Sequence, residues 1–380
     1  GGVLTAHAVL AGTVALLAAS GGLRLRPFLL VRVMRGAAGA GPWWAAAGIA
    51  ATVSLWPLLV APESNTDCFI YHLGLPWHAL RLHKLPPDAA PWLFHVPALF
   101  DFTQVIPLLL HDDRLARWSG VGCLLAAQAL WAERARARGR PRAAWLGALF
   151  VLALPPVLRV TTTAKCDLAA VALFAAGAGL CAGRNVLVGG FLLGCCAASK
   201  VVYAPLAAGW WLASPAAARR PVASGAAALL PLVGWWASAW LLTGEPLHPG
   251  GPSSAYSPGW GEANRSLLSL HAFLHTPAAA FSPIGLPGVW LAALLRDAPL
   301  ALGTLPLALA ARATRRPAVV LVLLQFLVLT VTHNPRYVLP ALVCQQQLAA
   351  IALLALAGRK ERGLARAGGA VAVILIALAA

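Results

Sequence analysis

Charged residues are rare in this sequence, and several stand at the ends of apolar runs, where they could do chemistry. Asp67 follows closely on an apolar segment and is itself followed by Tyr71 and His72. A carboxylate in such a place can accept a proton from a hydroxyl group or bind a divalent cation. The structural alternative is that Asp67 caps the helix that follows it. The residue pattern alone leaves both interpretations open.

Cations interrupt or begin apolar runs further along the chain. Lys200 lies inside one run, and Arg336 begins another directly after Pro335. Such a cation is costly unless it reaches a headgroup or pairs with an anion, and arginine suits a bidentate grip on phosphate. Snorkelling to any phospholipid is the alternative for both residues. Lys165 and Asp167 are two residues apart, which also allows a simple surface ion pair.

The histidines do not by themselves predict a metal site. His72, His78 and His83 are spaced six and five residues apart, so they do not share one helical face. A partnership of His72 with Asp67 or Asp101 stays open, because it would need a tertiary contact that the sequence cannot reveal.

The elements that must position these residues are predicted to be membrane helices. The chain has 380 residues, of which 60% are apolar and 11% charged, and its mean hydropathy is +0.75. An average soluble domain is about 25% charged, and disorder requires low hydrophobicity, so both classes are disfavoured. We therefore predict an all-α fold, a polytopic bundle of about 11–12 transmembrane helices forming a single domain over residues 1–380. The predicted spans are 3–20, 43–61, 119–133, 143–158, 168–183, 186–199, 201–213, 222–242, 298–311, 318–332, 338–357 and 369–380. Segments 96–110 and 283–295 are apolar but interrupted.

Clusters of basic residues orient the predicted bundle. Placing every cluster in the cytoplasm satisfies the positive-inside rule and puts the loops 62–118 and 243–282 outside. The outer loops then carry equal numbers of acids and bases, with the side of Arg296 and Asp297 left unresolved. The net charge of +17 therefore belongs to the cytoplasmic loops and does not indicate a nucleic-acid partner. The clusters are Arg24–Arg35, Arg134–Arg142, Arg184, Arg219–Arg220, Arg312–Arg316 and Arg359–Arg366.

Six short motifs, in order along residues 43–357, resemble those of bacterial GT-C-type integral membrane glycosyltransferases. Glu245 replaces the asparagine usual in that family, and the first loop lacks its adjacent acids. The glycines of the fourth motif also have the small-residue spacing of close helix packing, which is their default meaning. The motifs are Asp67-x-x-x-Tyr71-His72, Pro97-x-x-x-Asp101, Lys165-Cys-Asp167-Leu168, Gly190-x-x-x-Gly194 with Ser199-Lys200, Thr243-Gly-Glu245-Pro246 and Arg336-Tyr337-Val-Leu-Pro340.

The resemblance implies a hexosyl- or pentosyltransferase in the bacterial inner membrane, with its active site on the non-cytoplasmic side. Its partners would be a polyprenyl-phosphate-linked sugar, membrane lipids and an envelope glycan, lipid or protein acceptor. Asp67 would be the catalytic base, while Lys200 and Arg336 would bind the donor phosphate. A divalent cation is an open possibility. The residues that would orient the sugar, the acceptor or that metal are Tyr71, His72, Asp101, Lys165, Asp167 and Glu245.

The rival hypothesis is a transporter or flippase of a lipid-linked substrate. A transporter is expected to carry charged residues or broken helices near mid-membrane, often in two similar halves. No internal repeat is evident, and the polar residues cluster at one predicted face, which favours the enzyme.

Overall fold

The computed structural model describes residues 72–82, 100–110, 113–182, 185–243, 285–332 and 335–357, with isolated positions 56, 57, 59, 60 and 68. This described part is 90% helical and contains no strand, so the predicted all-α class is confirmed. The predicted segments 3–20 and 369–380, with most of 43–61, lie outside it.

The helices follow one another with short connections. The first group comprises α4 (Gly74–Leu82), the 3-10 helix η3 (Asp101–Gln104), α5 (Val105–Leu109), α6 (Asp113–Ala137), α7 (Pro141–Leu152) and α8 (Pro155–Thr161). Next come α9 (Asp167–Cys181), α10 (Val186–Ser199), η4 (Val201–Tyr203), α11 (Ala204–Ala213), α12 (Pro215–Ala218) and α13 (Pro221–Thr243). The last are α16 (Gly285–Asp297), α17 (Pro299–Ala310), α18 (Arg312–Thr332), η5 (Pro335–Val338) and α19 (Leu339–Ala357).

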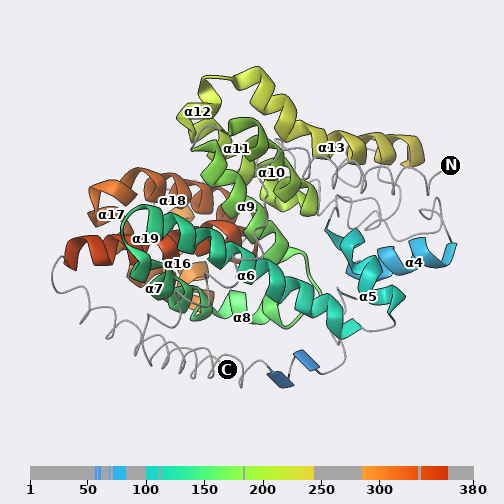
Figure 1. Ribbon diagram of the computed structural model, residues 1–380, viewed down its shortest axis with the longest axis horizontal. Coiled ribbons are helices and arrows are strands. Elements are labelled where there is room, and N and C mark those ends of the chain that lie inside the picture. Colours follow the sequence, from blue (N-terminus) through green and yellow to red (C-terminus); the bar gives the residue numbers. More distant parts are fainter. Residues whose placement is uncertain are drawn as a thin grey trace.

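Two helices hold the described bundle together. The buried helix α19 packs against α7, α17, α18 and α9, and α10 packs between α9 and α13 (Figure 1). α10 is apolar around nearly its whole circumference, and α19 is apolar apart from three glutamines, which is the pattern of helices enclosed by others.

Three consecutive glutamines lie buried midway along α19. Gln345 donates from Nε2 to the carbonyl of Ala301 on α17 at 2.6 Å and accepts from Gln325 on α18 at 2.8 Å. Gln346 accepts a hydrogen bond from Thr304 at 3.0 Å, and Gln347 Nε2 lies 2.5 Å from the side-chain oxygen of Gln128 on α6. These contacts join α19 to three neighbouring helices.

The small-residue motif of α10 packs helices, as its default meaning predicts. A Cβ added at Gly190 would lie 2.5 Å from the backbone oxygen of Ser224 on α13, and one at Gly194 would overlap that of Ala228. Only glycine lets the α10 and α13 backbones approach this closely.

The prediction of one continuous helix over 143–158 is wrong. The chain bends by 78° between α7 and α8, so the segment is two helices. Pro155 and Pro156 explain the break, because proline lacks an N–H and clashes with the preceding turn. A smaller difference concerns α18, which begins at Arg312 rather than near 318 and so takes a basic cluster into its first turns.

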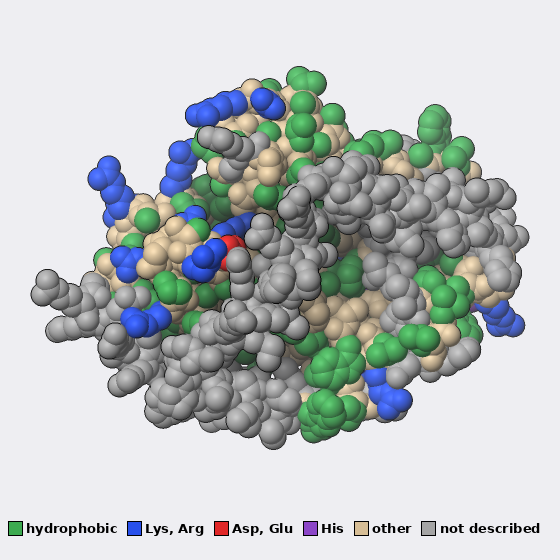
Figure 2. Space-filling model, viewed as in Figure 1, with side chains coloured by type: hydrophobic (Ala, Val, Ile, Leu, Met, Phe, Trp, Pro, Cys, Tyr) green, Lys and Arg blue, Asp and Glu red, His purple; other side chains and the backbone are tan. Residues whose placement is uncertain are grey.

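Length and hydropathy qualify one described helical stretch, Pro335–Ala357, to cross a membrane alone, and the bent pair α7 and α8 would be a second if counted as one span. Other apolar helices are shorter, among them α9, α10 and α17. Large apolar side chains nevertheless lie on the surface, including Val222, 85% exposed, and Leu241, 84% exposed, at the two ends of α13. The space-filling view shows green apolar side chains along α13, while blue Lys and Arg side chains gather over α12 and beside α17 and α18 (Figure 2).

Candidate functional site

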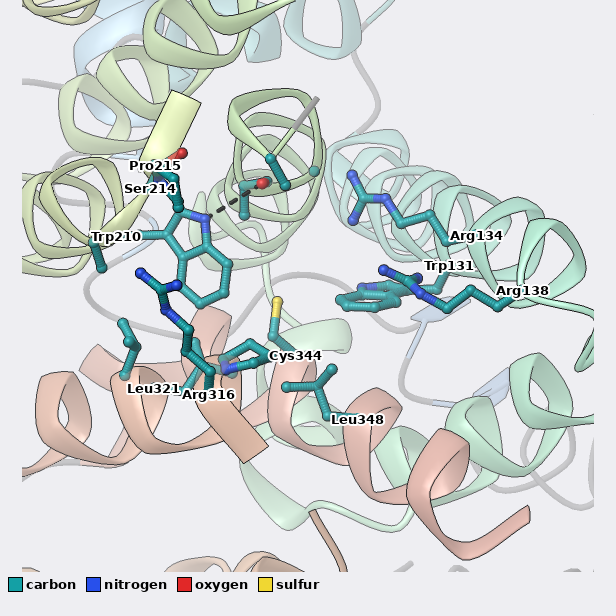
Figure 3. A pocket seen from close by; sticks show the side chains of 16 residues that line it. Trp131, Arg134, Arg138, Trp210, Ser214, Pro215, Arg316, Leu321, Cys344 and Leu348 are labelled. Carbon is teal, nitrogen blue, oxygen red and sulfur yellow. Dashed lines mark hydrogen bonds between the residues drawn. The ribbon is translucent and has the colours of Figure 1, made fainter. Parts of the chain in front are cut away.

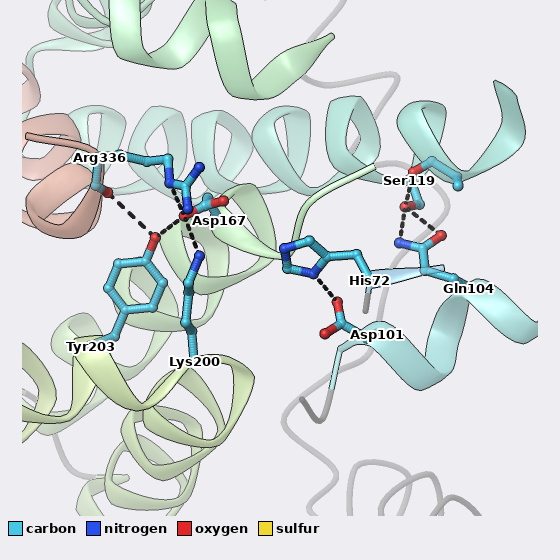
Figure 4. Close-up of polar contacts among 9 residues, drawn as sticks. His72, Asp101, Gln104, Ser119, Asp167, Lys200, Tyr203 and Arg336 are labelled. Atoms are coloured by element: carbon cyan, nitrogen blue, oxygen red, sulfur yellow. Dashed lines mark hydrogen bonds and ion pairs between the residues drawn. The ribbon is translucent and has the colours of Figure 1, made fainter. Parts of the chain in front are cut away.

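Three charged residues from distant parts of the chain meet around one buried carboxylate. Asp167 Oδ1 lies 3.9 Å from Lys200 Nζ and 3.6 Å from Arg336 Nε (Figure 4). The Asp167 side chain is fully buried, and the two cations are 14% and 20% exposed. The two cations thus share a single carboxylate oxygen.

Helix ends position these side chains. Asp167 opens α9, and Lys200 follows the last residue of α10 in an extended conformation. Arg336 lies in the single turn of η5, after Pro335 has prevented the chain from continuing α18. Because α9 and α10 pack side by side and α19 crosses α9, these three helix ends meet.

Two tyrosines complete the centre, and the sequence analysis assigned neither a role. The Tyr203 hydroxyl donates a short hydrogen bond to Asp167 Oδ1 and lies 3.4 Å from the Arg336 carbonyl oxygen. The Tyr337 ring lies under both cations, with Lys200 Nζ and Arg336 Cζ each 5.3 Å from its centroid. The rarity of tyrosine could have singled these two residues out, because the whole chain has four tyrosines.

A buried His–Asp pair lies beside this centre. His72 Nδ1 and Asp101 Oδ1 are 2.8 Å apart, which is the tertiary contact that the sequence left open. Gln104, in the same turn as Asp101, donates to Ser119 on α6 at 3.1 Å and so ties this turn to the bundle. Burial raises the pKa of Asp101 above its usual range, and the contact with His72 partly offsets that effect.

The His72 ring lies between Asp101 and the Asp167–Lys200 pair (Figure 4). With one ring nitrogen held by a carboxylate, the imidazole has a fixed orientation, the arrangement found where histidine acts as a general base. The two clusters form one polar region, which we call the outer-end site because the sequence predicts that its residues lie on the outer side of the membrane.

One set of residues has the donors for a metal ion. Ligand atoms of His72, Asp101 and Cys166 all lie within 4.8 Å of one another, and all three residues are buried. Nitrogen and sulfur donors fit an ion such as Zn²⁺, whereas Mg²⁺ and Ca²⁺ prefer oxygen ligands.

A small cavity of about 240 Å³ opens next to Arg336. Its lining includes the buried Lys165, which shares this space with Arg336. Asp297 also lines it and pairs with Arg159 at 3.5 Å. The Arg296–Asp297 pair, whose side of the membrane the sequence left unresolved, therefore lies at this end of the bundle.

The remaining predicted site residues cannot be placed. Asp67, Tyr71 and Glu245 lie outside the described residues, so their proposed roles stay predictions. Among the predicted residues that are described, Asp167, Lys200 and Arg336 come together, His72 and Asp101 form the adjacent pair, and Lys165 faces the neighbouring cavity.

No protein-family model, curated protein or solved structure matches the chain.

Proposed function

We propose that this protein is a multi-pass membrane glycosyltransferase that moves a sugar from a polyprenyl-phosphate donor to an envelope acceptor. The observation that carries the proposal is the convergence of Lys200 and Arg336 on one side of Asp167, although 136 positions separate them. Snorkelling to lipid would not require the two cations to share a partner. Two cations held close together suit a phosphate group, which offers several acceptor oxygens.

The distribution of charges supports a membrane orientation. Residues assigned to the outer side, including His72, Asp101, Lys200 and Arg336, gather in one region. Arginines assigned to the cytoplasm line a cavity at the opposite end of α9. Large apolar side chains exposed along α13 suit a lipid-facing surface.

The proposed chemistry divides among the residues of the outer-end site. The acceptor hydroxyl attacks the anomeric carbon, the new carbon–oxygen bond forms, and the bond to the phosphate oxygen breaks. The polyprenyl phosphate leaves with the electron pair, and Lys200 and Arg336 stabilise the charge that grows on it. Asp67 takes the hydroxyl proton, with the His72–Asp101 pair as the second candidate for this step.

Tyr203 and Asp167 have a positioning role in this scheme. The hydrogen bond from Tyr203 and the two cations all use Asp167 Oδ1, while Oδ2 has no hydrogen-bond partner in the described part of the chain. Oδ2 can therefore accept a hydrogen bond from a hydroxyl group of the donor sugar.

The direct test uses purified protein in nanodiscs with labelled polyprenyl-phosphate sugars and envelope acceptors. Lys200→Ala and Arg336→Ala should each weaken donor binding by about 10- to 100-fold, the effect of losing a charged hydrogen bond. Acceptor binding should change little. Arg296→Ala is the matched control, because Arg296 lies at the same end but is 68% exposed and pairs with Asp297. Donor affinity that is unchanged in both test variants would remove the phosphate site from the proposal.

The proposed orientation has its own test, by thiol labelling in intact cells. A membrane-impermeant reagent should reach single cysteines introduced at residues 75–90 and 250–262, and should not reach those at 136–140 or 359–366. Permeabilised cells are the control, because there the reagent should reach the introduced cysteines of all four segments. Labelling of 136–140 in intact cells would reverse the orientation and place the outer-end site in the cytoplasm.

A further inference from the structure

A second and larger cavity lies at the other end of α9, away from the outer-end site. Its volume is about 450 Å³, and its walls come from α6, α9, α11, α18 and α19. Ala178 in its lining is separated from Asp167 by about 16 Å along the helix, at 1.5 Å per residue. Nothing in the proposed transfer reaction uses this cavity.

The charged residues in the cavity wall are all of one sign. Arg134, Arg138 and Arg316 line it, and no acid is among the described residues of its lining. Arg134 is held in place, because its Nη2 donates to the Ala175 carbonyl at 2.8 Å and its guanidinium lies 5.1 Å from the Trp131 ring centroid. Arg138 and Arg316 are exposed, and neither side chain has an ion-pair partner among the described residues. Gathering these cations around one hollow is favourable when an anion occupies it.

A buried hydrogen-bond donor in the same wall gives an independent indication. Trp131 is 7% exposed, and its Nε1 has no hydrogen-bond partner in the described part of the chain. A buried donor without an acceptor is destabilising. The other indole differs, because Trp210 Nε1 lies 3.3 Å from the Ala178 carbonyl oxygen. The Trp131 donor therefore lacks the acceptor that a bound anion could supply.

The rest of the wall is apolar and aromatic. Trp210 and Arg316 lie on one side of the cavity and Trp131, Arg134 and Arg138 on the other, with Cys344 between them (Figure 3). Leu321 and Leu348 extend the apolar surface. A ligand that fills the cavity thus needs an anionic group and an apolar or aromatic body.

We infer that this cavity binds a phosphate ester, with the phosphate between Arg138 and Arg316 and the apolar body against Trp131 and Trp210. A phosphate group offers several acceptor oxygens, which matches two guanidinium groups and an indole N–H. The body of the ester separates this ligand from inorganic phosphate, which would leave the aromatic walls uncovered. The inference does not depend on the proposed glycosyl transfer.

The same chemistry can come from a soluble metabolite or from a lipid headgroup, and two probes separate these sources. Phenyl phosphate represents the soluble ester and dioctanoyl phosphatidate the lipid. Benzyl alcohol and dioctanoylglycerol are the uncharged controls for each. Binding to the full-length protein in neutral detergent is measured by calorimetry, which is independent of any enzymatic activity.

The decisive variant is Arg138→Gln combined with Arg316→Gln. It should weaken binding of the preferred phosphate probe at least tenfold. The matched control is Arg220→Gln with Arg312→Gln, which removes the same charge from exposed arginines outside the cavity and should change affinity less than twofold. Trp131→Phe keeps the ring but removes the donor, and should weaken binding by about threefold to tenfold.

Each outcome decides the matter. Tight binding of either phosphate probe, lost in the cavity variant and kept in the control, supports the site, and the better probe identifies the source. Equal losses in the two double variants would show general attraction of anions to a basic face and would overturn the site. Failure of the unmodified protein to bind either probe, or equal binding of the uncharged controls, would overturn it as well.

Discussion

Asp167→Asn should destabilise the folded protein by about 3–5 kcal/mol, the usual effect of removing one partner from a buried ion pair. The Asp167 side chain is fully buried and faces both Lys200 and Arg336. Asparagine keeps the shape of the side chain but removes the negative charge that faces both cations. Unfolding by denaturing detergent in mixed micelles measures the difference.

Two further variants make this prediction specific. Asp297 lines the small cavity next to Arg336 and pairs with exposed arginines. Asp297→Asn should therefore lower the stability of the folded protein by less than about 1 kcal/mol. Adding Lys200→Met to Asp167→Asn should recover part of the stability, because one of the two cations that face position 167 is then gone. Equal stability of Asp167→Asn and the unmodified protein would mean that the charged centre does not hold these helix ends together.

The second large effect concerns the transfer step itself. Asp67→Asn should lower the transfer rate by about 10²- to 10⁴-fold, the usual loss when a general base is removed. Donor affinity should stay the same, because the base acts on the acceptor hydroxyl. Asp88→Asn changes another acid of the same loop and should leave the rate near that of the unmodified protein.

The His72–Asp101 pair offers the competing base, and the same assay separates the two. If Asp67 is the base, His72→Gln should cost less than about tenfold. A full loss in His72→Gln together with near-normal turnover in Asp67→Asn would transfer the role to the histidine. Asp101→Asn should then follow His72→Gln, because a carboxylate that orients an imidazole acts through it.

Hydrophobic patterning predicted most helices closely. The predicted segment 186–199 has the same bounds as α10, and 168–183, 222–242 and 298–311 differ from their helices by only a few residues. The failures have local causes. Pro155 and Pro156 split 143–158 although its apolar run is continuous. α18 begins earlier than its apolar run because charged arginines can form helical backbone hydrogen bonds as well as apolar residues can.

The candidate site was predictable only in part, because its members meet through tertiary packing. Lys200 and Arg336 were recognisable, since a cation beside an apolar run needs a partner. That this partner is Asp167, and not a lipid headgroup, depends on how α9, α10 and α19 cross. The Tyr203–Asp167 hydrogen bond and the His72–Asp101 contact depend on the same packing, which spacing along the sequence does not reveal.

The glutamines of α19 have a consequence for a residue that they never approach. A helix can slide or turn about its axis within an apolar sheath at little cost, but successive residues point about 100° apart. A turn by one residue would break the contacts of Gln345, Gln346 and Gln347 together. The glutamines thus fix the rotation of α19 about its axis. They thereby also fix the angle at which Arg336, in the η5 turn that leads into α19, meets Asp167.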